Sequence, residues 1–159
     1  EGGAQALTPD KLRHKLPAAF EHLTPHEAHF VHTATPSDSQ VVAMGWRYEA
    51  LNVLLWALGL VDELSWPAQV CDVAHCVSLL VNVNADPDAL VQDSMLRPRA
   101  DILDQLDLHM RLHWLLRDAE LHGKPSPDVS RGVVMERHHA LNWLIDFEHA
   151  PWDKVSTAT

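Results

Sequence analysis

The chain has 159 residues, of which 47% are hydrophobic and 21% are charged, a composition typical of a single globular domain. Its formal net charge is −10 and its twelve Lys and Arg residues are spread along the chain, which argues against nucleic acid as a partner. No apolar run reaches the ~18–20 residues that a membrane-spanning helix needs, which argues against insertion into a membrane. We therefore expect one cytoplasmic domain over residues 1–159.

The two cysteines also favour a cytoplasmic location. Cys71 and Cys76 lie five residues apart in what the sequence pattern predicts to be one helix. On a helix their side chains would point about 140° apart, so they could not form a disulfide without unwinding it. Two unpaired thiols are typical of a reducing compartment.

The first forty residues contain one weak and one strong helix signal. Residues 1–8 are small and polar and are expected to be disordered, and a weakly amphipathic helical segment is expected over 10–22. The stronger signal is at 24–27, where Thr24 can cap the helix, Pro25 suits its first position and Glu27 its third. This arrangement predicts a helix over 25–32.

One helix pattern, Arg-x-x-Ala-Leu-Asn-x-Leu, occurs twice, at 47–54 and at 137–144. The first copy lies in a predicted long helix, 38–58, which opens on a capping box and stops at Gly59. The second copy lies in a predicted helix over 131–147. The sequence therefore predicts a pseudo-repeat of these two helices.

Three further helices are predicted between the two copies, at 70–81, at 86–94 and at 98–122. The last of these is apolar almost all round, as is typical of a helix buried at the centre of a bundle. No alternating strand pattern appears. We expect an all-α fold, a compact bundle of about six helices around a buried central helix, 98–122, with Trp152 of an irregular tail docked onto it.

The polar side chains of the repeat allow two interpretations. Arg47 and Arg137 are in line with an apolar stripe, so each guanidinium must find an acceptor or reach water. Asn52 and Asn142 lie on another face. The favoured interpretation is that these Arg and Asn residues fix helix packing. The alternative is that both arginines bind one anionic ligand, since forked donors suit a carboxylate or a phosphate.

The predicted central helix carries His109 and His113 at the i, i+4 spacing of a helical metal pair. No Glu follows His109 in the manner of zinc proteases, and a third ligand would have to come from elsewhere. We therefore predict no metal site and interpret both residues as hydrogen-bonded core histidines. The sequence also lacks a Gly-rich phosphate loop, a Gly-x-Ser-x-Gly nucleophile turn and a Cys-x-x-Cys pair, so no cofactor and no catalytic residue is predicted.

Two function hypotheses follow. The leading one is a small helical binding or protein-interaction module, with a protein partner or a second copy of itself, because six Trp are many for one domain and Trp is favoured at interfaces. The other is a hydrolase acting on a small anionic substrate, held by arginines, with His113, Glu136 or His138 as acid or base. The candidate ligand-binding residues are Arg47, Glu49, Asn52, His113, Arg117, Glu136, Arg137, His138 and Asn142.

Several motifs occur in an order that resembles a known family. They are the runs at 46–59, 97–98, 107–108, 111–114, 117–119, 136–144 and 152–153. Over 46–159 the chain resembles the bacterial family called domain of unknown function 4272, and this resemblance implies a helical domain without an established activity. The expected family ending has two acidic positions that are changed here, to Lys154 and Ala158, so we assign no role to acidic groups in the tail.

Overall fold

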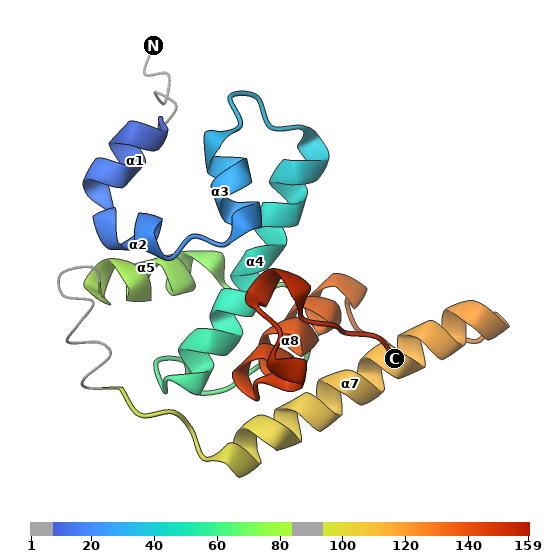
Figure 1. Ribbon diagram of the computed structural model, residues 1–159. Helices are drawn as coiled ribbons and strands as arrows, with labels where there is room; N and C mark the ends of the chain where they lie inside the picture. The colour runs from blue at the N-terminus through green and yellow to red at the C-terminus, as the bar shows by residue number, and fades with distance from the viewer. Residues whose placement is uncertain (1–7, 84–93) are drawn as a thin grey trace. The chain divides into compact units, whose positions relative to one another are not determined.

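The computed structural model describes residues 8–83 and 94–159, and within these ranges all regular structure is helical (Figure 1). Seven α-helices and two short 3₁₀ helices fall in the described residues, which confirms the predicted all-α fold. The predicted helix at 86–94 falls almost wholly outside the described residues, and so does the segment expected to be disordered at the N-terminus. None of the described helices is long and apolar enough to cross a membrane.

The chain divides into two compact units, residues 1–42 and residues 43–159. The first unit contains α1 (Pro9–Lys15), α2 (Pro17–Glu21) and α3 (Pro25–His32). The segment expected over 10–22 is thus two helices, because Pro17 disfavours helical geometry at the preceding residue and then opens the next helix.

The predicted helix at 25–32 is confirmed as α3, with the capping box in place. The backbone N–H of Glu27 donates to Thr24 Oγ1 at 3.3 Å, and the backbone N–H of Thr24 donates to Glu27 Oε2 at 2.9 Å. The two side chains therefore satisfy two backbone donors at the helix start.

The second unit begins inside α4 (Asp38–Ala57) and continues with the following elements: α5 (Val73–Val83), α7 (Arg99–His122), α8 (Arg131–Leu144), η1 (Phe147–His149) and η2 (Trp152–Lys154). The predicted stops at Gly59 and Gly123 are confirmed, since both have the left-handed backbone, φ 76° and 60°, that glycine adopts without strain. The second repeat helix ends three residues earlier than predicted, at Leu144.

Both repeat copies contribute to the main core of this unit. Its buried residues come from α4, α7 and α8: Ala50, Val53, Trp56, Ala57, Ile102, Ala140 and Leu141. The contact between α7 and α8 is extensive and includes a second cluster of Leu112, Leu116 and Val134. The repeat helices are therefore core elements.

The helix predicted over 98–122 is present and packs against α8, but it is not enclosed at the centre of the bundle as we expect from its composition. Only one side of α7 is buried, and the opposite side carries Leu103, Met110, Trp114 and Leu121, which are 39%, 42%, 53% and 69% exposed. At 100° per residue these four lie within about 40° of one another around the helix. Composition alone could not show this, because an apolar outer face and an apolar buried face look alike in sequence.

The expected position of the cysteines is also wrong. Asp72 accepts a hydrogen bond at 3.0 Å from the backbone N–H of His75, as an N-cap residue does, and α5 begins only at Val73. Cys71 therefore precedes the helix. It lies with Cys76 in one buried cluster beside Leu55, and both thiols are free.

Candidate functional site

Arg137, in the second repeat copy, is fully buried and forms an ion pair with Glu49 of the first copy. Its Nε donates to Glu49 Oε2 at 3.1 Å, and its Nη1 donates to the backbone carbonyl of Ser65 at 2.6 Å. The other carboxylate oxygen of Glu49 accepts the backbone N–H of Cys71. This one buried pair thus joins α8 and α4 to two points of the chain between α4 and α5.

Arg47, at the same position of the first copy, lies nearer the surface. Its side chain is 24% exposed, and its Nη2 lies 3.4 Å from Asp153 Oδ1. Its guanidinium carbon lies 5.5 Å from the centre of the Trp152 ring, a favourable place for a cation. Each of the two arginines thus has a carboxylate of the chain itself as its partner, and the two carboxylates are different ones.

The tail docks as the sequence predicted, with Trp152 as its anchor. The Trp152 ring lies edge-on to Trp143 and His139 of α8, with ring centres 5.2 Å and 4.9 Å apart. Asp153, for which no role was predicted, accepts the hydrogen bond from Arg47 beside it. The acidic residue that this tail retains is therefore part of the packing.

The two asparagines of the repeat are buried and hold separate segments. Asn142 Nδ2 donates to the backbone carbonyl of Ser156 in the tail at 2.8 Å. Asn52 Oδ1 accepts from Cys76 Sγ of α5 at 3.6 Å. Both amides make contacts within the fold, which supports the packing interpretation of these residues.

The arginine contacts of the two copies cross over. Arg137 of the second copy bonds Ser65, which follows the first copy, and Arg47 of the first copy bonds Asp153, which follows the second copy. Each repeat helix therefore positions the segment that leaves the other one. This reciprocal arrangement also favours a structural role for the pattern.

Two buried histidines link α7 to α8. The Nδ1 atoms of His113 and His138 lie 3.2 Å apart, so one ring donates and the other accepts. Burial lowers the pKa of His138 to about 4, with His113 the next largest cause. Burial also lowers the pKa of His113, and the positive charges of Arg131 and Arg117 add to that effect.

His109 is a third buried imidazole on the same side of α7. Its Nδ1 lies 2.8 Å from the backbone carbonyl of Gln105, while its Nε2 makes no hydrogen bond within the described part of the chain. Burial lowers its pKa to about 4, although the hydrogen bond to Gln105 acts in the opposite direction. In residues 8–83 and 94–159, no group of three or more His, Cys, Asp or Glu is placed to hold a metal ion.

The remaining two candidates, Glu136 and Arg117, form no printed hydrogen bond with another candidate but lie near some of them, Glu136 near Arg47 and Arg117 near His113. Glu136 is half-buried on α8, where burial raises its pKa and the positive charge of Arg47 partly opposes this rise. Arg117 is exposed on α7, beside the apolar face defined above. Within the described residues, the nine candidates therefore lie in several small contact groups.

One strongly bonded residue had no predicted role. Arg97, before α7, donates from Nε to the carbonyl of Trp56 at 2.7 Å and from Nη2 to those of Val61 and Asp62, both at 2.8 Å. These carbonyls lie at and beyond the end of α4, where cations are favoured. Nothing in the sequence indicates this contact, because the partners lie 35 to 41 residues away.

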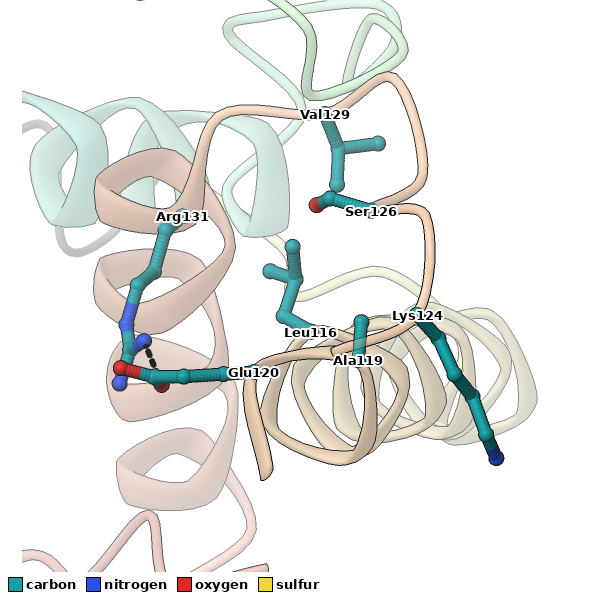
Figure 2. Close-up of a pocket in the computed structure, with 7 residues that line it drawn as sticks. All are labelled: Leu116, Ala119, Glu120, Lys124, Ser126, Val129 and Arg131. Carbon is teal, nitrogen blue, oxygen red and sulfur yellow. Dashed lines mark hydrogen bonds and ion pairs between the residues drawn. The ribbon is translucent and has the colours of Figure 1, made fainter. Parts of the chain in front are cut away.

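A pocket of about 280 Å³ lies where the end of α7 meets the start of α8 (Figure 2). Its lining is Leu116, Ala119, Glu120, Lys124, Ser126, Val129 and Arg131. Arg131 forms an ion pair with Glu120, and Lys124 with Asp118, so both lining cations already have carboxylate partners. Neither repeat copy and none of the nine candidates contributes to this pocket.

Comparison with known proteins gives a family and nothing more specific. The family described as "Domain of unknown function (DUF4272)" matches residues 4–155. The match extends the resemblance seen in the sequence, which began at residue 46, to most of the first unit. No curated protein and no solved structure matches the chain.

Proposed function

Since the chain belongs to the family Domain of unknown function (DUF4272), whose description assigns no activity, we propose a function from the structure: a helical protein-interaction module that presents the outer face of α7. One observation carries this proposal. Leu103, Met110, Trp114 and Leu121 form an exposed apolar line along the helix, on the side away from its buried residues.

A row of exposed apolar side chains on one helix face is unusual on a protein surface that contacts only water. Single exposed apolar residues are common on monomeric proteins, whereas several gathered on one helix face are typical of an interaction site. The line includes Trp114 at its centre, and Trp is the residue type most enriched among those that dominate binding energy. Met110 beside it adapts its shape to a partner.

The hydrolase hypothesis receives no comparable support. It requires Arg47, Arg117 and Arg137 to hold one anionic substrate, yet Arg137 is buried against Glu49 and Arg47 lies against Asp153. An anion would have to displace a carboxylate in both places. We therefore propose no reaction, and we retain a cytoplasmic location on the strength of the two free buried thiols.

The proposal is tested by site-specific photo-crosslinking in the cells that make the protein. A photoreactive amino acid replaces Met110 or Trp114 in two variants, and replaces the exposed Gln69 in a third as the control. We expect a protein adduct of the same mass from both α7 positions and none from position 69. Absence of an adduct at 110 and 114, or equal labelling at all three positions, contradicts the proposal.

A further inference from the structure

The apolar line on α7 is part of a longer, regular seam. Asp107, whose side chain is 52% exposed, and the exposed Arg117 fall between its apolar members. The full set, called the α7 seam below, is Leu103, Asp107, Met110, Trp114, Arg117 and Leu121. Its members are separated alternately by four and three residues, the spacing by which one helix packs against another in a coiled coil.

When the α7 seam is aligned with a second copy running in the opposite direction, each residue lies opposite one that suits it. Position 112 is its midpoint, and residues equally far from this point form three kinds of pair: leucine with leucine at the ends, methionine with tryptophan at the centre, and aspartate with arginine between them. A two-fold axis that relates two antiparallel helices brings such residues opposite each other. Each of these pairings is favourable, the central one because a thioether packs well against an aromatic ring.

The charged pair selects this orientation over the parallel one. In a parallel pair each residue of the α7 seam faces its own copy, so Asp107 would meet Asp107 and Arg117 would meet Arg117. Like charges facing each other across an interface are unfavourable. In the antiparallel pair every Asp107 meets an Arg117, and its carboxylate can still accept the hydrogen bond from Arg111 of its own helix.

We infer that the partner bound by the α7 seam is a second copy of this chain, paired antiparallel about a two-fold axis at position 112. This inference rests on the proposed interaction function and specifies its partner. The seam is about 27 Å long at 1.5 Å per residue, which is short for a stable interface. The dimer is therefore reversible and dissociates on dilution.

A charge exchange tests the pairing directly. Positions 107 and 117 are about 15 Å apart along one helix, so their side chains cannot meet within a chain. The variants Asp107→Arg and Arg117→Asp each place like charges opposite each other, and the double variant restores opposite charges. By sedimentation equilibrium of the full chain, we expect each single variant to weaken the dimer at least tenfold and the double variant to return to within about threefold of the unchanged protein.

Circular dichroism of all four proteins shows whether they are equally folded, which is expected because both positions are exposed. A monomer at every concentration tested, or a double variant as weak as the single ones, overturns the antiparallel dimer. The experiments distinguish failure of the antiparallel dimer from failure of the proposed interaction function. If the purified chain is monomeric but positions 110 and 114 crosslink to a different protein in cells, self-pairing is wrong and the interaction function stands.

Discussion

Arg137 and Arg47 occupy the same position of the repeat but differ in what surrounds them. Arg137 is 0% exposed against Glu49, whereas the Arg47 side chain is 24% exposed against Asp153. Removing one member of a fully buried ion pair leaves the other charge without compensation, which costs about 3–5 kcal/mol. Arg47 and Asp153 form a partly buried pair whose cation still reaches water, and pairs in contact with solvent contribute about 0–1 kcal/mol.

We therefore expect Arg137→Met to lower the free energy of unfolding by about 3–5 kcal/mol and Arg47→Met by about 1 kcal/mol or less, measured by urea denaturation. Should Arg137→Met not fold, the double variant with Glu49→Leu is informative, because removing both charges removes the uncompensated one. We expect the double variant to be more stable than Arg137→Met. Equal losses for the two single variants would contradict this view of the repeat.

The sequence could identify these arginines but not their partners. Each lies in line with an apolar stripe, so the need for an acceptor is visible locally. The acceptor itself is 88 residues away for Arg137 and 106 residues away for Arg47. By contrast, the capping box at Thr24 was predicted because its partner is only three residues away.

Among the helices, the contact between α4 and α8 is very close at one glycine. A Cβ placed on Gly132 of α8 would lie 2.5 Å from the Trp46 ring of α4, a distance that requires the ring to move. Gly45 of α4 immediately precedes Trp46. A Cβ placed on Gly45 would have no heavy atom of another group within 4 Å. The two glycines therefore form a matched pair of helical sites, one crowded and one open.

We expect Gly132→Ala to reduce the free energy of unfolding by about 1–3 kcal/mol through overpacking. Gly45→Ala is expected to increase it by about 0.5–1 kcal/mol, because alanine is the better helix former and no group resists it. The melting temperatures of the two variants should thus move in opposite directions. A stabilised Gly132→Ala would show that Trp46 moves at little cost.

Most helix bounds in the described residues could be predicted because their signals are local. Gly59 and Gly123 stop their helices, and proline opens α3. The outer face of α7 could not be predicted, since which side of an apolar helix is covered depends on its neighbours. The start of α5 was misplaced for a related reason: Val70 continues the helical spacing, but Asp72 caps the helix after it.

For the molecule as a whole, the buried imidazoles of α7 and α8 make stability depend on pH. Burial lowers the pKa of His109 and of His138 from 6.5 to about 4. Between these two pKa values, the two histidines are protonated in the unfolded chain but not in the folded chain. Stability therefore falls as the pH decreases from about 6.5 toward 4, and is unaffected by these groups above that range.

We expect the urea midpoint to be lower at pH 5 than at pH 7.5, and the difference to be smaller in His138→Asn, which cannot take up the proton. His75, which is exposed on α5, provides the control, since His75→Asn should leave the difference unchanged. A difference that is the same in all three proteins would show that the buried imidazoles do not cause the pH dependence.

The crossing contacts of the repeat also bear on the order in which the chain is made. Glu49 receives its cation only when residue 137 is available, and Arg47 receives its carboxylate only when residue 153 is available. During synthesis the first repeat helix thus emerges from the ribosome long before the groups that complete its surroundings. The second unit therefore acquires its native packing around α4 only after these late residues have been made.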